Sequence, residues 1–96
     1  MNGYVAPSQC LILKNMFNPS TETEDDWDLE MKEDVADEVA KYGNVSFIHV
    51  DKVNPQGLVY IRTDTIDSAL SVQKALDKRY FAGRQIEASF MVIASS

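Results

Sequence analysis

The sequence predicts an α+β domain in which two helices pack on one face of an antiparallel β-sheet. Three observations predict this class. The chain has 96 residues, which is enough for one small core. Its content of 45% hydrophobic and 25% charged residues is that of an ordinary globular protein, so wholesale disorder is excluded. Its apolar residues recur with strand and helix spacing in alternation, and turn residues separate these segments.

The first half of the chain predicts a strand, a helix and a second strand. The apolar run Cys10-Leu11-Ile12-Leu13 is too short for a helix and indicates a buried strand. Turn residues at 18–21 and an acidic stretch lead into a helix that stops at Gly43. The run at 45–50 is rich in β-branched and aromatic residues and predicts the second strand. The expected apolar face of the helix comprises Leu29, Val35, Ala36, Val39 and Ala40.

The second half predicts a strand, a helix and a last strand. A turn at Asn54-Pro55-Gln56-Gly57 precedes an extended run at 58–63. Asp64 or Thr65 caps the second helix, and the alternation of apolar residues at 85–92 suits a half-buried strand. The expected inward side of the helix comprises Ile66, Ala69, Leu70, Gln73 and Leu76, and that of the strand comprises Ile86, Ala88, Phe90 and Val92.

The resulting order, β-α-β-β-α-β, is that of the ferredoxin-like fold, with two helices on one face of a four-stranded antiparallel sheet. We expect one domain at 9–93 and loose termini at 1–8 and 94–96. No run approaches the ~18 consecutive apolar residues of a membrane span. The N-terminus also lacks the features of a signal peptide.

Acidic residues dominate the charge of the chain and are concentrated in one segment. Fifteen acidic against nine basic residues give a net charge of −6. Ten of these carboxylates fall between Glu22 and Glu38, where Lys32 is the one cation. Because affinity for a phosphate backbone depends on Lys and Arg, this balance disfavours generic nucleic-acid binding and favours a basic partner.

The sequence contains no motif typical of an enzyme. It has no Gly-rich phosphate loop and no spaced set of metal ligands, since Cys10 and His49 each stand alone. We therefore interpret Cys10 as a small apolar filler and His49 as a residue on a strand surface. We expect no catalytic activity, no cofactor and no metal.

Two segments resemble the signature sequences of the RNA recognition motif (RRM), whose sheet aromatics stack on unpaired bases. Ile12 and Leu58 occupy two of the three stacking positions, and only Tyr60 is aromatic there. Gln56 replaces the usual basic residue. Each base–aromatic stack is worth ~1–3 kcal/mol, so RNA binding by this sheet is disfavoured and stays the alternative. The two segments are Leu11-Ile12-Leu13-Lys14-Asn15-Met16 and Gln56-Gly57-Leu58-Val59-Tyr60-Ile61-Arg62-Thr63.

Glu30, Asp34 and Glu38 form one column on the predicted first helix, because they are spaced four residues apart. Like charges at this spacing destabilise a helix by ~0.2–0.5 kcal/mol per pair. Glu38 also lies in the half of the helix where the helix dipole no longer helps a carboxylate. One interpretation is a solvated face that keeps the protein soluble. The other is a functional surface, where such local rules are often broken.

The tripeptide Arg79-Tyr80-Phe81 before the last strand favours the functional interpretation. Together with the acidic helix and the altered signatures, it resembles the U2 auxiliary factor homology motif (UHM), a subclass of RNA recognition motifs that binds protein. Within this subclass the C-terminal domain of CAPER-type splicing factors is most similar, and the Tat-specific-factor-like branch also suits. The matching stretches are Leu13-Lys14-Asn15-Met16-Phe17-Asn18-Pro19, Trp27-Asp28, Lys32-Glu33-Asp34-Val35, Lys41-Tyr42-Gly43, Val50-Asp51-Lys52, Gln56-Gly57, Val59-Tyr60 and Arg79-Tyr80-Phe81-Ala82-Gly83.

The resemblance implies a site for a short disordered peptide in which basic residues precede a tryptophan. Phe81 would pack against the indole, and Arg79 would pair with Glu38 across its other side. Glu30 and Asp34 would meet the Lys and Arg residues of the peptide. This fits the chemistry, because Arg stacks on an aromatic ring while its planar fork holds a carboxylate.

The resemblance also implies partners and a location. The partners would be Trp-containing ligand-motif peptides of splicing factors, such as the large splicing factor 3b subunit and the large U2 auxiliary factor subunit, in the nucleus. It implies weak or no RNA binding and no membrane. Trp27 itself does not fit such a ligand motif, because its neighbours Asp25, Asp26 and Asp28 are acidic. We expect Trp27 to pack at the start of the first helix.

Overall fold

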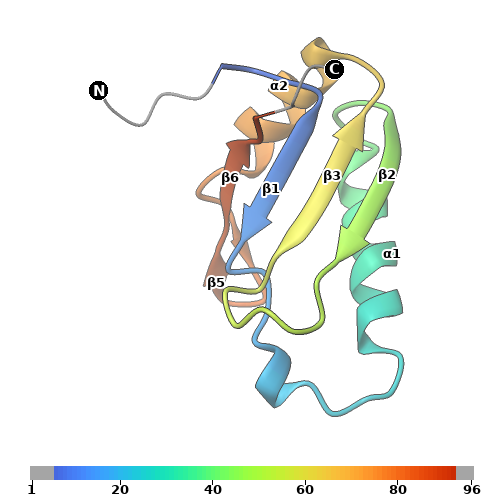
Figure 1. Cartoon of the computed structure of the whole chain (residues 1–96), viewed down its shortest axis with the longest axis vertical. Helices are drawn as coiled ribbons and strands as arrows, with labels where there is room; N and C mark the ends of the chain where they lie inside the picture. Colours follow the sequence, from blue (N-terminus) through green and yellow to red (C-terminus); the bar gives the residue numbers. More distant parts are fainter. Residues whose placement is uncertain (1–5, 93–96) are drawn as a thin grey trace.

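The computed structural model describes residues 6–92 and contains the six predicted elements in the predicted order (Figure 1). The expected loose termini fall largely on 1–5 and 93–96, which lie outside the described residues. Near the N-terminus, the Ser8 hydroxyl donates a hydrogen bond to the carbonyl of Met91 at 2.6 Å. The elements are β1 (Cys10–Lys14), a 3₁₀ helix (Pro19–Thr21), α1 (Trp27–Val39), β2 (Val45–Val50), β3 (Val59–Thr63), α2 (Ile66–Leu76), β4 (Tyr80–Phe81), β5 (Arg84–Gln85) and β6 (Glu87–Phe90).

Four of the strands form one antiparallel sheet with the order β2-β3-β1-β6. In the centre, Leu11 of β1 lies opposite Ile61 of β3, and Leu13 lies opposite Ala88 of β6. Both helices cover the same face of this sheet (Figure 1). The predicted ferredoxin-like class is therefore confirmed, and a separate two-stranded hairpin, β4–β5, is added before the last strand.

The core lies between the sheet and the two helices. The inward side chains of the central strands, Leu11, Leu13, Val59 and Ile61, are at most 1% exposed. Burying an aliphatic side chain of this size stabilises the fold by ~1.5–3 kcal/mol. The helices cover these strands with Val35 and Val39 of α1 and with Ala69, Val72 and Leu76 of α2.

Four predicted core positions lie at the surface instead: Leu29, Ala40, Ile66 and Val92. Leu29 and Ile66 belong to the first turns of their helices, and the first buried residues follow only at Val35 and Ala69. Val92 lies beyond the end of β6, so the predicted alternation continues past the paired strand. Periodicity alone therefore overestimated how far each element lies over the core.

The 3₁₀ helix and α2 follow the expected capping chemistry, whereas α1 has no side-chain hydrogen bond at its N-cap Asp26 and ends at Val39, before the predicted stop at Gly43. The Thr65 hydroxyl accepts a hydrogen bond from the amide of Ser68 at 3.1 Å, so Thr65 caps α2, and not Asp64. Asn18 caps the short 3₁₀ helix by accepting from the amide of Ser20 at 3.1 Å. These caps satisfy backbone donors that the first turn of a helix leaves free.

Gly57 joins the turn after β2 to the end of β1. Its backbone has a positive φ of 68°, and its carbonyl accepts a hydrogen bond from the amide of Met16 at 3.0 Å. A Cβ atom at this position would collide with the backbone carbonyl oxygen of Phe17. The glycine of the signature sequence is thus required by close backbone approach as well as by its dihedral angle.

We expect Gly57→Ala to lower the free energy of unfolding by ~2 kcal/mol or more, because it combines backbone strain with a steric collision. Gly83→Ala is the matched control, since Gly83 also has a positive φ, of 80°, but open space around the missing Cβ. This control should lose only ~1 kcal/mol. Urea unfolding of both variants measures the difference. Equal losses would show that the contact with Phe17 carries no penalty.

Candidate functional site

The predicted ion pair between Glu38 and Arg79 is present in the structure. Arg79 Nη2 lies 3.0 Å from Glu38 Oε2, which connects the last turn of α1 to the residue before β4. Lys41 Nζ approaches the other carboxylate oxygen at 3.1 Å. Both oxygens of Glu38 are therefore engaged by cations, which fixes the carboxylate beside the hairpin.

Tyr42 is a member of this cluster that sequence reasoning did not single out for the site. Its hydroxyl accepts a hydrogen bond from Arg79 Nη1 at 3.0 Å and donates to Glu38 Oε2 at 3.5 Å. Both terminal nitrogens of the guanidinium are thus held, one by Tyr42 and one by Glu38. The signal that was available is the spacing of Glu38 and Tyr42, which puts them on one side of a helical turn.

The electrostatics of the cluster favour its charged state. The hydrogen bond from Lys41, followed by that from Arg79, holds the pKa of Glu38 below its usual 4.5, although partial burial works against this. The hydrogen bond to Tyr42 and then the one to Glu38 raise the pKa of Arg79 above its usual value. The pair is therefore ionised throughout the physiological pH range.

Phe81 closes a small apolar cavity beside this ion pair. The cavity has a volume of about 20 Å³. Since a water molecule needs roughly 10–15 Å³, no indole enters the cavity unless the hairpin or Phe81 moves. Asp34 and Glu38 of α1 stand among its otherwise apolar walls. The cavity is lined by Leu13, Met16, Asp34, Val35, Glu38, Val39, Leu76, Phe81 and Ile86.

The β4–β5 hairpin carries Phe81 and is anchored on one side by the pairing of Arg79 with Glu38 and on the other by Arg84. Its tip is a two-residue turn in which Ala82 and Gly83 both have positive φ, 51° and 80°, as tight hairpin turns require. Arg84 Nη1 donates to Asn15 Oδ1 at 3.2 Å, which attaches the hairpin to the end of β1. Tyr80 is 71% exposed, so it points outward as expected.

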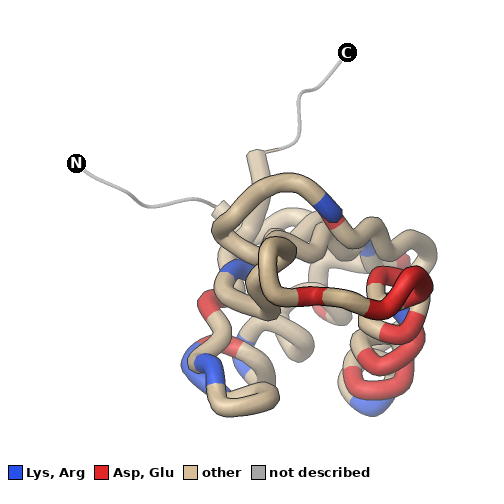
Figure 2. The backbone as a smooth tube through the Cα atoms, turned by 90° about the horizontal axis from the view of Figure 1, so that it is seen from below, with Lys and Arg blue, Asp and Glu red and all other residues tan. Residues whose placement is uncertain are grey.

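The carboxylate column on α1 divides into two environments. Glu30 and Asp34 are exposed and make no ion pair with a described residue, whereas Glu38 is half-buried and doubly paired. Acidic residues run along α1 and the segment before it, and basic residues lie mostly elsewhere (Figure 2). The helix layer therefore presents a negative surface next to the Phe81 cavity.

The open face of the sheet carries more aromatic surface than the signature positions predicted. His49 lies between Phe47 and Tyr60, with ring centroids 6.5 and 6.1 Å apart, and Phe47 is 56% exposed. Leu58, counted above as a stacking position, is buried at 4% exposure. Phe47 was missed because it lies on β2, outside both signatures; its spacing of two residues from His49 was the available signal.

The remaining residues that drew attention have structural roles. Trp27 packs edge-on against Phe17, with ring centroids 4.9 Å apart, which confirms it as a packing residue at the start of α1. Cys10 is a free, half-buried thiol. Within 6–92, no group of three or more His, Cys, Asp or Glu side chains is arranged to hold a metal ion. No helix in that range has the length and apolar character to cross a membrane.

Similar proteins contain a segment related to this sequence as a small part of a longer chain. The 17S U2 SnRNP complex component HTATSF1 of Mus musculus is 34% identical over 79 residues, which are 81% of this chain and 10% of that protein. Zinc finger CCCH domain-containing protein 5 of Arabidopsis thaliana is 31% identical over 107 residues, and the match covers 95% of this chain and 14% of that protein. Inner nuclear membrane protein Man1 of Mus musculus is 28% identical over 82 residues, and the match covers 85% of this chain and 9% of that protein. The chain therefore spans only 9–14% of these relatives.

A sequence family described as the linker between RRM2 and RRM3 domains in RBM39 protein matches residues 3–27. Two solved structures match almost the whole fold. URNdesign, a complete computational redesign of human U1A protein, has a TM-score of 0.78 at 21% identity, with 99% of this chain and 94% of that chain covered. The Pes4 RRM3 structure has a TM-score of 0.70 at 12% identity, with 93% of this chain and 98% of that chain covered. The chain therefore has the fold of an RRM domain. At these identities the likeness establishes the fold alone and leaves the ligand open.

We expect Tyr42→Phe to loosen Arg79 without disturbing the fold. The ring stays packed while Arg79 loses the acceptor for Nη1, a hydrogen bond worth ~0.5–1.5 kcal/mol. NMR relaxation of the Arg79 side-chain N–H groups should then report faster motion. Tyr80→Phe is the control, because the Tyr80 ring is 71% exposed and its hydroxyl has no partner within 6–92. Identical relaxation in both variants would contradict this role of Tyr42.

The lowered pKa of Glu38 predicts a pH-dependent contribution to stability. Because the folded state favours the ionised carboxylate, this contribution is complete above the usual value of 4.5 and is lost as the pH falls through the lowered pKa. Wild type should therefore exceed Glu38→Gln in unfolding free energy at neutral pH, by ~1 kcal/mol at most for such a surface pair. The difference should vanish in acid. A difference that persists there would indicate lost packing instead.

Proposed function

We propose that this RRM-type domain is a protein-interaction module of the UHM subclass, part of the pre-mRNA splicing machinery, and that it binds short basic peptides containing tryptophan. The observation that carries this proposal is the ion pair of 3.0 Å between Arg79 and Glu38 beside the cavity under Phe81. An apolar cavity with a fixed guanidinium at its rim suits a flat aromatic side chain that also tolerates a cation on its face.

In this proposal the indole enters between α1 and the β4–β5 hairpin. Phe81 supplies an aromatic wall, and the Arg79 guanidinium lies across the other side of the indole while Glu38 and Tyr42 hold it. Opening the site means shifting Phe81, because the closed cavity measures only about 20 Å³. Val35, Val39 and other core side chains then form the apolar floor.

The acidic residues of α1 explain why the proposed peptide also needs basic residues. Glu30 and Asp34 are exposed beside the cavity and are free to meet Lys and Arg side chains of the peptide. Such exposed pairs contribute orientation and association rate more than affinity. Glu38 differs, because its pairing with Arg79 places it next to the site of the indole.

The comparisons support a splicing context and a nuclear location for this proposal. They include the linker between RRM domains of RBM39 and a relative named as a component of the 17S U2 SnRNP complex. A third relative is named as an inner nuclear membrane protein. We propose peptides of the large splicing factor 3b subunit and of the large U2 auxiliary factor subunit as the candidate partners.

One observation favours a second candidate function, binding of single-stranded RNA on the open sheet face. Phe47, His49 and Tyr60 form an aromatic row there, and each ring offers a surface on which a base can stack. The absence of an aromatic side chain at Ile12 and the net charge of −6 oppose this function. Titration with oligo-U alongside the peptide distinguishes the two.

Calorimetry with a basic peptide that contains one tryptophan tests the peptide proposal. We expect one-to-one binding, and we expect Phe81→Ala to weaken it by ~2 kcal/mol or more, because an aromatic wall of the pocket is lost. Tyr80→Ala, an exposed neighbour, should bind as wild type does. Circular dichroism must first show that Phe81→Ala is folded. A folded Phe81→Ala with full affinity, or tight binding of oligo-U with no binding of the peptide, would refute the proposal.

Charge reversal on α1 separately tests the proposed attraction between its carboxylates and the basic residues of the peptide. Glu30→Lys and Asp34→Lys should mainly slow association and flatten its dependence on salt, because the Debye length falls from ~10 Å at 0.1 M to ~3 Å at 1 M. Asp67→Lys on α2 makes the same change in net charge away from the cavity and is the control. Glu38→Ala should also speed dissociation, since it releases Arg79. Stopped-flow rates equal to those of the control would identify the column as a solvated face.

A further inference from the structure

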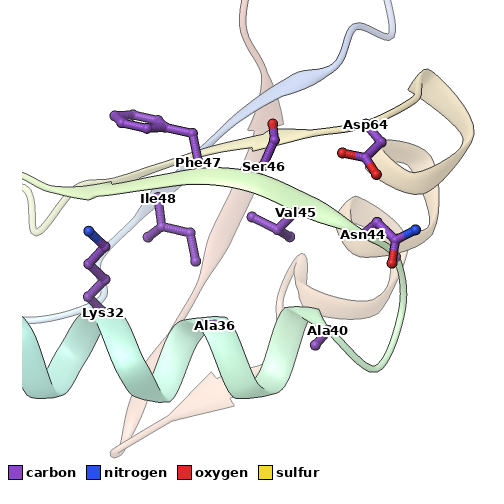
Figure 3. Close-up of a pocket in the computed structure, with 10 residues that line it drawn as sticks. Lys32, Ala36, Ala40, Asn44, Val45, Ser46, Phe47, Ile48 and Asp64 are labelled. Atoms are coloured by element: carbon purple, nitrogen blue, oxygen red, sulfur yellow. The ribbon is translucent and has the colours of Figure 1, made fainter.

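A groove runs along the free edge of β2, on a different flank of α1 from the Phe81 cavity (Figure 3). Its volume is about 660 Å³. On the helix side the small residues Ala36 and Ala40 leave room, and on the strand side Val45 and Ile48 point into the gap. Lys32 lies towards one end and Asp64 at the other. The groove therefore has room for side chains of a further chain segment, between apolar residues of α1 and β2 and polar residues at its ends.

The backbone of β2 is unpaired along this groove. The amide of Asp51 bonds to the carbonyl of Leu58 at 3.0 Å, so in this register His49 also bonds to β3. The N–H and C=O groups of Ile48 and Val50 then point away from β3, Ile48 beside the groove and Val50 beside an adjoining hollow along the same edge. Among the described residues, no other strand pairs with this edge.

The opposite edge of the sheet, formed by β6, is partly blocked by side chains at Ala88. Asp77 Oδ1 accepts a hydrogen bond from the amide of Ala88 at 3.0 Å, and Gln73 Nε2 donates to the carbonyl of Ala88 at 3.1 Å. Both groups come from α2 or its end and occupy backbone positions that a further strand would use. An exposed edge is a template for strand addition unless it is blocked in this way. The edge of β2 carries no such side-chain hydrogen bonds among the described residues and is therefore the more accessible of the two edges.

The charges around the groove indicate what kind of segment it takes. Glu33 and Asp37 follow Lys32 and Ala36 by one position each, which places them at the outer rim of the groove. Both are exposed and form no ion pair with residues 6–92. Within the lining, Lys32 and Asp64 offset each other. Glu33, Asp37 and the net charge of −6 therefore make the surroundings negative, which attracts a basic segment and repels a second copy of the same chain.

We propose that the edge of β2 is a second docking surface, which takes an extended basic segment of a partner protein as a fifth strand of the sheet. Alternate apolar side chains of the segment fill the groove over Ala36 and Ala40, and main-chain groups pair with Ile48 and Val50. The intervening Lys or Arg side chains lie over the exposed ring of Phe47. This surface is independent of the Phe81 cavity.

A capped peptide of about six residues, the length of β2, that alternates Val and Lys is a suitable probe. Its counterpart alternates Val and Glu. We expect the Val-Lys peptide to slow hydrogen exchange of the Ile48 and Val50 amides about tenfold at ~0.15 M salt. The Val-Glu peptide should leave these amides unchanged. Attraction to the acidic helix alone would shift resonances of Glu33 and Asp37 without protecting the two amides, and would overturn the proposal.

Substitutions in and away from the groove test where the Val-Lys peptide binds. Ala40→Leu fills the groove at the exposed residue that follows α1. It should weaken binding of the Val-Lys peptide at least about tenfold. Ser71→Leu makes a similar addition at an exposed position of α2 and should have no effect. Phe81→Ala should also leave this binding unchanged, which separates it from the proposed tryptophan site. Full binding by Ala40→Leu would overturn the proposal. Protection of Ile48 and Val50 by raised protein concentration, without peptide, would assign the edge to a second copy and also overturn it.

Discussion

The antiparallel pairing of β1 with β3 is the interaction on which the rest of the structure depends. It turns Leu11 and Leu13 of one strand and Val59 and Ile61 of the other towards the same face, where they are almost completely buried. Both helices must lie on that face to exclude water from these side chains. The position of α1 follows from this constraint, and with it the place where Glu38 meets the chain that returns from α2.

The second element of the site is positioned by backbone hydrogen bonds. The amide of Lys78 bonds to the carbonyl of Ile86 at 2.7 Å, and the amide of Ile86 bonds to the carbonyl of Arg79 at 2.7 Å. These bonds close the base of the β4–β5 hairpin and leave the Arg79 side chain free to reach α1. The ion pair with Glu38 is thus made between two rigid segments, so little additional conformational entropy is lost in forming it.

Much of the fold could be predicted from the sequence, because the buried strands and helices carry strong local periodicity. The pairing of Arg79 with Glu38 came from a family resemblance, since no local rule connects two residues that far apart in the chain. Tyr42 was missed as a partner of Arg79 for the same reason. Leu29 was misplaced because helical periodicity says which residues share a face but not where the sheet beneath it ends. The free edge of β2 depends on strand order, which local patterns do not determine.

The small volume of the cavity under Phe81 has a consequence for any ligand that enters there. At about 20 Å³ the cavity is too small for a large side chain, so a ligand that inserts one there needs an open form in which Phe81 or the hairpin has moved. The apparent dissociation constant of such a ligand is its intrinsic value divided by the fraction of open molecules. Anchoring of the hairpin by Arg84 and Asn15 lowers that fraction. The strength of this contact within the domain therefore helps to set the affinity of the ligand, and loosening the hairpin would tighten binding without adding a contact to the ligand.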